Sequence, residues 1–542
     1  MLSYRKLAMR VLGRPFHTGR IDSPRPASQR AAAFILTAAM LTTLAAPAFA
    51  DIWHIENGDI TISAGESCNN VTQNNNTTYG DTNTIITNQN KDTASSHTVT
   101  IEAKDKDDKV EVTLKDVNID TSSRNKAAVS VTGEGDTNIK LDGDNALKSD
   151  IYRSGIYGSG SGSLTISGGE NDSLTAQGGS GISSNGSLTI SGGTVTAKGG
   201  SGEDGSGGRG IISTKSVTIS GGTVNANGGN GNSGGDGITS NGGVTISSGS
   251  TVTANGGNGG SLVGGDGIRS GGGLTVSDGT VTAKGGNGDS KDGYGGDGIR
   301  SGGVVTISGN TVNAAGGYGG KVGGYGICSF DRVAISGGTV EAAGGNGSTG
   351  GGSGIYSSVI DLSGSLELTA KAGSPTGKAL LQNGRELDLD TIKDKLGPGA
   401  KVTTTDANGK TKEVSSPLPV EPEGPVIPEE SSSSSDDGSA TPSAPASPLP
   451  GLTVTDKDGQ RISYTSTQSG NTLTVCVGRF TASFRISLAA LRQLRAEGIE
   501  TIAFQTILCS TTLSVDELLA MGGEDAEAVL THRFTDSSLT VG

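Results

Sequence analysis

One phrase recurs between residues 154 and 373 of this 542-residue chain, and it restricts the fold more than any other feature. Each copy reads Gly-Ile-x-Ser, then Val/Leu-Thr-Ile-Ser-Gly-Gly, then Thr-Val-Thr/Asn-Ala-x-Gly-Gly, and ends in a glycine-rich loop. Successive copies begin 24–31 residues apart. A period of this length is typical of a solenoid, in which each repeat forms one coil and stacks on its neighbours.

The three segments of each copy alternate apolar and polar residues, which is the pattern of a short, half-buried strand. One coil alone cannot bury its apolar residues, but stacked coils place isoleucine on isoleucine in a continuous ladder. Glycine at the corners supplies backbone angles that other residues reach only with strain. The isoleucines of the first segment are Ile156, Ile182, Ile211, Ile238, Ile268, Ile299, Ile327 and Ile355.

Proline is absent between Asp51 and Ser374. Proline would remove a hydrogen-bond donor from a sheet that continues from coil to coil. We therefore predict a mainly β protein in which residues 51–390 form a glycine-rich parallel β-helix with three short strands per coil. Its first coils, before residue 154, alternate less regularly, as expected of an exposed solenoid end.

The chain changes character after the repeats. Residues 391–450 are predicted to contain a cap followed by a disordered linker, because most of the 15 prolines, a serine run and many acidic residues lie there. A short helical cap is expected over residues 387–396. Residues 451–542 contain less glycine and are predicted to form a small α+β domain of unknown function.

Two helices are predicted in this last domain. Ser487 is a helix-capping residue before Leu488–Ala496, and Gly498 follows the helix end. Ser514 and Glu517 form a capping box for a second helix, Val515–Met521. Cys476 and Cys509 lie in strand-like runs of the same domain, and both a disulfide and two buried thiols remain open.

The first fifty residues have the pattern of a signal peptide. Seven basic residues precede the apolar run at 31–46, and the small residues Ala48 and Ala50 suit signal peptidase. The run is shorter than the roughly 20 residues that span a bilayer. We therefore expect a secreted or cell-surface protein without a transmembrane segment after cleavage at residue 50.

The charge restricts the class of partner. The whole chain has a formal net charge of −14, and removal of residues 1–50, with seven basic and one acidic residue, would bring it near −20. Such a charge argues against nucleic acid and anionic membrane surfaces as partners. It favours solubility and an affinity for cations.

The repeats resemble the β-helical carbohydrate-binding family of secreted clostridial and related gut-bacterial surface proteins, whose fold is like that of pectate lyases. The similar features are the early strand region Val112-Thr-Leu-Lys-Asp-Val-Asn-Ile and the repeated Gly-x-Leu/Val-Thr-Ile-Ser-Gly-Gly-Thr-Val-x-Ala phrase, over roughly residues 95–375. The resemblance implies binding of acidic plant polysaccharide and calcium, without catalysis.

Three aspartates occupy one place in consecutive copies. Asp236, Asp266 and Asp297 each stand in Gly-Gly-Asp-Gly-Ile, so stacked coils would place them about 4.8 Å apart. Carboxylates at this spacing repel one another unless solvent or a cation intervenes, and oxygen ligands suit Ca²⁺. These three residues are the candidate metal ligands, with calcium as the candidate cofactor. Solvated turn carboxylates without a metal are the alternative.

Other side chains also stack by register. Arg269 and Arg300 both follow Gly-Ile, and a row of this kind would serve a polysaccharide lyase only beside an acidic cluster, which the sequence does not reveal. We therefore predict no catalytic residues and no enzyme activity. Neighbouring coils carry tyrosines that would stack on sugar rings: Tyr294, Tyr318, Tyr325 and Tyr356.

Three functions remain open at this point. The leading hypothesis is a non-catalytic protein that binds polysaccharide or a host or cell-surface glycan, with calcium assisting the binding of an acidic polymer. The alternative is a structural or adhesive β-solenoid at the cell surface. A polysaccharide lyase is the third and least favoured interpretation.

Overall fold

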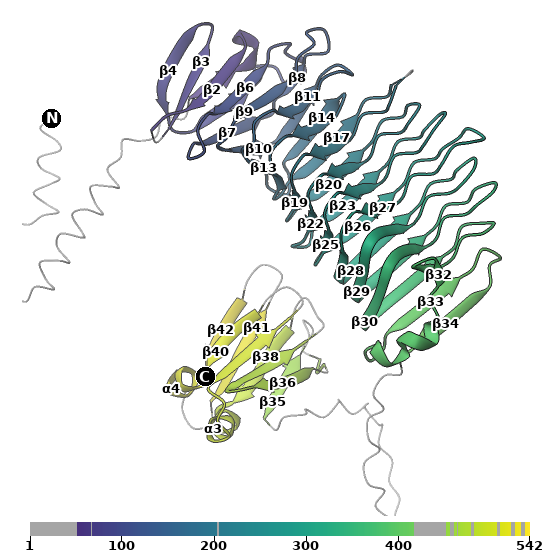
Figure 1. Cartoon of the computed structure of the whole chain (residues 1–542). Coiled ribbons are helices and arrows are strands. Elements are labelled where there is room, and N and C mark those ends of the chain that lie inside the picture. The colour runs from purple at the N-terminus through teal and green to yellow at the C-terminus, as the bar shows by residue number, and fades with distance from the viewer. Residues whose placement is uncertain are drawn as a thin grey trace, which may run out of the picture. The chain divides into compact units, whose positions relative to one another are not determined.

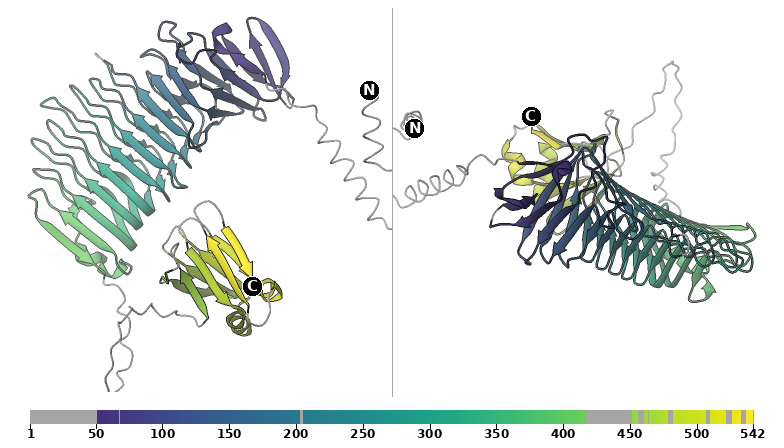
Figure 2. Two further views of the ribbon diagram at one scale, coloured as in Figure 1. Left: turned by 180° about the vertical axis from the view of Figure 1, so that it is seen from behind. Right: turned by 90° about the horizontal axis from the view of Figure 1, so that it is seen from above.

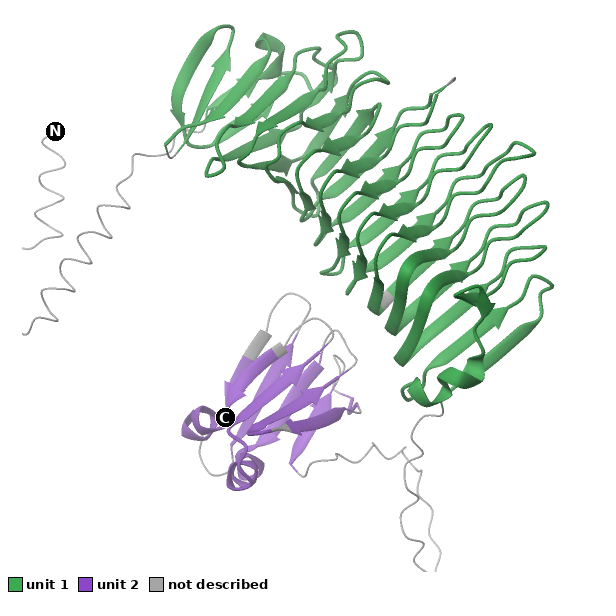
Figure 3. Cartoon of the chain, in the orientation of Figure 1, with its two compact units in different colours: residues 1–422 green, residues 423–542 purple. Residues whose placement is uncertain are grey.

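The computed structural model describes residues 51–416, except 67 and 203–204, and residues 451–541, except 456–459, 463, 478–481, 507–509, 522–525 and 533–536. The predicted signal peptide and linker lie outside these residues. The chain divides into two compact units, one ending at Pro422 and the other beginning at Glu423 (Figure 3). The first unit is a parallel β-solenoid of about 13 turns (Figure 1).

The first ladder of the solenoid is formed by the Gly-Ile-x-Ser segments and their counterparts near both ends. Each strand pairs in parallel with the strand one coil away. Its strands are β2 (Ile60–Ala64), β6 (Val99–Ala103), β9 (Val129–Gly133), β12 (Ile156–Gly158), β15 (Ile182–Ser184), β18 (Ile211–Ser213), β21 (Ile238–Ser240), β24 (Ile268–Ser270), β27 (Ile299–Ser301), β29 (Ile327–Ala343), β30 (Ile355–Lys371) and β31 (Leu380–Gln382).

The second ladder contains the Val/Leu-Thr-Ile segments, and near its end it continues through β29 and β30, which turn the corner without a break. Its other strands are β1 (Ile52–His54), β5 (Thr84–Thr87), β7 (Lys109–Lys115), β10 (Asp136–Asp142), β13 (Leu164–Ser167), β16 (Leu188–Ile190), β19 (Val217–Ile219), β22 (Val244–Ile246), β25 (Leu274–Val276) and β28 (Val305–Ala315).

The third ladder contains the Thr-Val-x-Ala segments and also passes through β28, β29 and β30. Its other strands are β8 (Asn118–Asp120), β11 (Asp144–Lys148), β14 (Ser173–Gly178), β17 (Thr194–Gly199), β20 (Thr223–Asn227), β23 (Thr251–Asn255), β26 (Thr280–Lys284) and β33 (Lys401–Thr405).

The predicted isoleucine ladder is confirmed. Ile182 lies opposite Ile156 on one side and Ile211 on the other, and the same register continues to Ile355. All eight of these side chains are fully buried. Full burial of an isoleucine contributes roughly 1.5–3 kcal/mol, so the ladders supply the apolar core that a glycine-rich chain otherwise lacks.

Glycine has two different roles in the repeats. At the Ser-Gly-Gly corners, Gly193 and Gly222 have φ of +73° and +71°, so the expected need for unusual backbone angles holds there. In the loops, glycine instead allows neighbouring backbone segments to lie in direct contact. A Cβ on Gly265 would lie far inside van der Waals distance of the Gly235 carbonyl oxygen, and Gly286 is equally crowded by Gly257.

These loop glycines form two facing stacks, which we call the glycine columns. Gly257 donates its amide hydrogen to Gly235 of the previous coil, Gly265 donates to Gly257 within its own coil, and Gly286 donates to Gly265, each at 2.8 Å. Beyond the glycine columns, the rest of each loop stacks on the loop of the next coil, and the loops form a row along one side of the solenoid (Figure 2). The columns are Gly229, Gly257, Gly286, Gly317, Gly345 and Gly373, and Gly208, Gly235, Gly265, Gly296, Gly324 and Gly352.

Both ends of the solenoid are irregular. At the start, β3 (Asn69–Gln73) and β4 (Asn76–Asp81) add an antiparallel hairpin to β2, and the short helix η1 (Ile55–Asn57) follows β1. At the other end, β32 (Arg385–Glu386) pairs with β31, and the 3₁₀ helix η2 (Leu389–Lys395) occupies the place expected for a helical cap.

The sheet continues past residue 390. Strand β33 pairs with β30 through Leu368 and Val402, and β34 (Thr411–Ser415) pairs antiparallel with β33. This last coil has no copy of the repeated phrase, so the sequence pattern placed the end of the ladder too early.

The second unit has two four-stranded sheets around one apolar core, to which Phe484 and Phe504 contribute rings 5.3 Å apart. One sheet contains β35 (Leu452–Thr455), β38 (Ala482–Ser487), β41 (Glu527–His532) and β42 (Ser537–Val541). The other contains β36 (Thr465–Ser469), β37 (Thr472–Cys476), β39 (Thr501–Gln505) and β40 (Ser510–Ser514).

Both predicted helices of this unit are confirmed as α3 (Leu488–Ala496) and α4 (Val515–Met521). Ser487 Oγ accepts the Ala490 amide hydrogen at 3.2 Å, and Gly498 has a φ of +90° at the helix end. Arg461 forms a single antiparallel bridge with Thr455, and β36 begins at Thr465. The polar β36 lies at the edge of its sheet, so no apolar alternation signals it.

Candidate functional site

The three predicted aspartates lie directly above one another on the glycine-rich coils, just before β21, β24 and β27. Asp236 Oδ1 accepts the amide hydrogen of Asp266, Asp266 Oδ1 accepts that of Asp297, and Asp297 Oδ1 accepts that of Tyr325, at 2.8, 2.8 and 2.7 Å. We call this row the aspartate ladder. Each carboxylate therefore bonds one coil to the next.

The aspartate ladder is buried. None of the three residues is more than 5% exposed, because the loops and their glycine columns enclose them. The solvation that the alternative expected is therefore wrong, whereas the binding of a metal by these residues is not tested. A turn that carries a long loop buries its side chains, whereas a tight surface turn leaves them in water.

An arginine lies beside each carboxylate. Arg209 Nε is 3.7 Å from Asp236 Oδ2, one arginine N–H nitrogen of Arg269 is 3.5 Å from Asp266 Oδ2, and the corresponding nitrogen of Arg300 is 3.1 Å from Asp297 Oδ2. The arginine side chains are 36–52% exposed. Their guanidinium groups thus face solvent on one side and a buried carboxylate on the other.

Arg209 belongs to this row although sequence reasoning missed it. It stands in Gly-Gly-Arg-Gly-Ile, at the place that aspartate occupies in the next three coils. Stacking of one residue type at one position of the repeat does not signal Arg209, because its neighbours at that position are aspartates. Alignment of opposite charges in adjacent copies would have found this arginine.

The predicted stacking of Arg269 on Arg300 is confirmed by the register of β24 and β27. Thr239 precedes them in the ladder and Cys328 follows them. Thr239 Oγ1 donates to Asp236 Oδ2 at 2.8 Å, so Asp236 has a hydrogen-bond donor where Asp266 has only an ion pair.

Asp266 is the least compensated member of the ladder. Its Oδ2 is buried and accepts no hydrogen bond. Burial, and then the neighbouring carboxylates of Asp297 and Asp236, raise the pKa of Asp266 well above its ordinary value. Burial also raises the pKa of Asp297, although the Tyr325 amide and Arg300 act in the opposite direction.

The geometry bears on the calcium hypothesis. A cation at the ladder would have to occupy the side of each carboxylate where an arginine already lies. Among the residues that the structure describes, no three His, Cys, Asp or Glu side chains are grouped so as to hold a metal ion. Calcium binding by Asp236, Asp266 and Asp297 remains a prediction.

A groove of about 610 Å³ lies over this row. Arg209, Arg269 and Arg300 line it together with Tyr294 and Tyr325. The ring of Tyr294 is partly exposed, and Lys321 Nζ lies 5.6 Å from its centre. We call this hollow the arginine groove.

The predicted tyrosines do not form one platform. Tyr325 and Tyr356 stack on each other, with ring centres 5.1 Å apart, so each covers part of the other's face. Tyr318 is exposed but does not line the arginine groove. Tyr294 is the member of the set that offers an exposed ring to the groove.

The cysteines add no reactive group to the groove. Cys328 is buried next to Arg300, and burial followed by the negative charge of Asp297 raises the pKa of its thiol to about 12. Cys68 also carries a free thiol, and Cys476 Sγ lies 3.5 Å from Gln505 Oε1. Cys509 lies outside the described residues, so its pairing with Cys476 is not tested.

Comparison with known proteins yields no relative. No family model, no curated protein and no solved structure matches the chain. Within the described residues, no helix is long and apolar enough to cross a lipid bilayer. The structure itself shows the fold, which is a parallel β-solenoid followed along the chain by a small α+β unit.

Proposed function

We propose that this protein is a secreted or cell-surface β-solenoid that binds acidic polysaccharide without catalysis. The observation that carries the proposal is the arginine groove, in which three guanidinium groups lie in a row with an exposed tyrosine ring beside them. The resemblance of the repeats to β-helical carbohydrate-binding proteins points in the same direction.

The buried aspartates lie beside the arginines that would bind the ligand. Arg300 donates to Asp297 Oδ2 at 3.1 Å, whereas Arg209 and Arg269 lie 3.7 and 3.5 Å from their carboxylates, and all three arginines line the groove. Planar guanidinium groups bind carboxylates through paired hydrogen bonds. Arg269 and Arg300 are one coil apart, about 4.8 Å along the axis, a spacing that suits successive acidic groups of an extended polymer.

The charge balance of the groove favours an anion. The raised pKa of Asp266 lowers the fraction of this carboxyl that is ionised at a given pH, which reduces the negative charge beside the arginines. The rest of the mature chain is strongly acidic. Nonspecific polyanions are therefore repelled, and only a polymer that fits the row gains from it.

The test is an array of acidic and neutral plant, bacterial and host glycans, probed with the purified protein in millimolar calcium and in EDTA. We expect acidic glycans to bind, and Arg269→Ala with Arg300→Ala to abolish that binding. Arg332→Ala is the matched control, because this arginine is exposed on β29 and does not line the groove.

The two buffers separate the possible ligand-binding groups. Binding that persists in EDTA supports recognition by arginine, whereas binding that EDTA removes supports calcium held by the aspartate ladder. If no acidic glycan binds in either buffer, the proposal fails. A structural or adhesive role, which the regular stacked fold also suits, then becomes the better explanation.

A further inference from the structure

Two of the other hollows on the solenoid share residues with each other, and one of them also shares a residue with the arginine groove. The first, of about 520 Å³, is lined by Tyr152 and Ser154, which also line the second, of about 800 Å³. Ser206 lines both the second hollow and the arginine groove. We infer that the three hollows are one groove that follows the solenoid axis and holds an extended chain of an acidic polysaccharide.

A column of backbone hydrogen bonds shows that the hollows are in line. The residue two places before the first-ladder isoleucine lines a hollow in seven consecutive coils, and the glycine that follows it donates to the same position one coil further on, at 2.9–3.1 Å. The column consists of Ser154, Ser180, Arg209, Asp236, Asp266, Asp297 and Tyr325.

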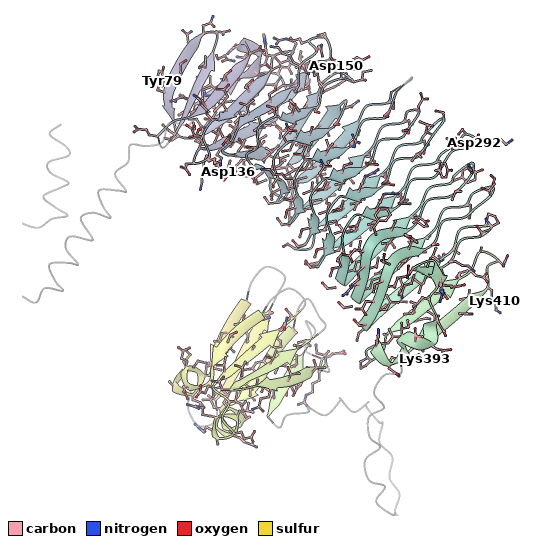
Figure 4. The ribbon with its side chains drawn as sticks, in the orientation of Figure 1. Tyr79, Asp136, Asp150, Asp292, Lys393 and Lys410 are labelled. Carbon is pink, nitrogen blue, oxygen red and sulfur yellow. The ribbon has the colours of Figure 1, made fainter. Side chains whose placement is uncertain are left out.

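The surrounding loops agree with this alignment. Asp150 begins the turn that carries Tyr152, and Asp292 lies in the loop before Tyr294. Figure 4 shows Asp150 and Asp292 on the same, loop-bearing side of the solenoid, away from Asp136. At about 4.8 Å per coil, the seven-residue column spans about 29 Å, enough for several sugar units in an extended chain.

The first hollow has the chemistry of an acidic-sugar site. Tyr152 is 81% exposed, and Tyr157 presents a partly exposed ring from the outward side of β12. Arg153 Nε donates to Asn125 Oδ1 at 2.9 Å, which restricts its guanidinium beside the hollow. Lys126 supplies a second cation to the lining.

These groups match a uronic acid residue. Aromatic rings pack against the apolar faces of sugars, and arginine and lysine bind a carboxylate. Hydroxyl groups from Thr98, Thr100 and Ser130 line the same hollow and can bond to sugar hydroxyls. The structure thus assigns a second acidic-sugar subsite at the end of the groove opposite the arginines.

This inference rests on the proposed function, and its test is the dependence of affinity on ligand length. Oligogalacturonates of defined short and long chain length are titrated calorimetrically into the purified protein. We expect affinity to rise with length until the chain spans both ends of the groove. The double variant Tyr152→Ala with Tyr157→Ala should weaken the long chains about tenfold, while the binding of short chains in the arginine groove should stay unchanged.

Tyr79→Ala is the matched control, because Tyr79 is 77% exposed on β4 and lines none of the three hollows. Arg300→Ala should weaken short and long chains alike. If short and long chains bind equally and the tyrosine variant has no effect, the continuous groove is excluded while the proposed function stands. If no oligogalacturonate binds, both fail for this class of polymer.

Discussion

The coils before residue 150 and the glycine-rich coils after residue 200 share three ladders but are tied together differently. In the early coils, charged side chains connect neighbours: Lys115 pairs with Asp142 at 2.6 Å, and Lys148 pairs with Asp120 at 2.8 Å. In the glycine-rich coils, backbone bonds backbone through the glycine columns. The early coils thus carry charged pairs between coils, whereas the loops of the glycine-rich coils close as they do only because the residues of the glycine columns have no side chain.

The acidic residues of the two regions also differ. Asp59, in the early coils, accepts hydrogen bonds from both ends of the Arg124 guanidinium at 2.6 and 2.9 Å and from the Thr98 amide. Burial alone would raise the pKa of Asp59, but these donors hold it well below its ordinary value. Asp266 has no such donors on Oδ2, and its pKa is raised. Hydrogen-bond donors, not burial alone, decide the direction of the shift.

The largest effect is expected from Gly265→Ala. The new Cβ would overlap the Gly235 backbone, which cannot move without breaking the glycine columns. We expect a loss of about 3 kcal/mol or more, centred on the neighbouring coils. Hydrogen exchange measured by mass spectrometry would locate it, because a solenoid need not unfold as one unit.

Gly260→Ala is the control for this prediction. Its Cβ would meet only the Gly231 carbonyl oxygen at 3.5 Å, an ordinary contact. If the amides of the neighbouring coils are equally protected from hydrogen exchange in Gly265→Ala and Gly260→Ala, the glycine columns do not require glycine. The comparison between the two regions would then be wrong.

A smaller effect is expected from Arg124→Ala in the early coils. The variant leaves the partly buried Asp59 without its main partner, and we expect a loss of about 1–2 kcal/mol, since Asp59 is partly hydrated. Lys115→Ala serves as the control, because both side chains of its ion pair with Asp142 are about half exposed and the pair should contribute little to stability. Denaturant titrations followed by hydrogen exchange in the early coils would compare the two.

The pH dependence of the early coils follows from the lowered pKa of Asp59. Because the folded protein releases this proton more readily than the unfolded chain, the stabilisation is present above pH 3.8 and disappears as the pH falls below that value. In Arg124→Ala this acid-induced loss should shrink. If the free energy of unfolding of the variant depends on pH as steeply as that of the unmodified protein, Arg124 is not the cause of the lowered pKa of Asp59.

The smallest effect, and one of opposite sign, is expected from Asp266→Asn. Because the pKa of Asp266 is raised, its contribution to the free energy of unfolding is fully present below pH 3.8 and is lost as the pH rises. Asparagine keeps the Oδ1 acceptor for the Asp297 amide but cannot ionise. The variant should match the unmodified protein in acid and become more stable relative to it toward neutral pH.

Thermal unfolding of Asp266→Asn across the acid-to-neutral range provides the measurement. Asn258 is the natural precedent for the substitution, because its Oδ1 already accepts the Asn287 amide hydrogen at 2.9 Å in the neighbouring loop. A variant that is less stable at every pH would show that the ionised carboxylate, through Arg269, stabilises the coil.

The C-terminal unit offers an independent check outside the solenoid. His532 is fully buried against Phe504, and its Nε2 lies 2.9 Å from Thr511 Oγ1. Burial lowers the pKa of His532. This unit should therefore lose stability as the pH falls below 6.5, and His532→Gln should reduce that loss. Fluorescence-detected or exchange-detected unfolding of residues 451–541 would measure it.

The sequence by itself determined the solenoid, its three ladders and the register of the eight isoleucines in the Gly-Ile-x-Ser segments. Apolar side chains at a period of two, repeated once per coil, have one efficient way to be buried, and proline is absent wherever the ladder must continue. The helices Leu488–Ala496 and Val515–Met521 were also predictable, because capping side chains act on backbone groups within one turn.

Only the tertiary structure decided what the loops do. Whether Asp266 is solvated or buried depends on how the loop limbs close over it, and that closure arises from contacts between glycines of adjacent coils. Arg209 joins the arginine row, and Tyr152 joins the same groove, through positions several coils apart. A repeat fixes which residues share a face, but burial, charge pairing and grooves depend on the stacked whole.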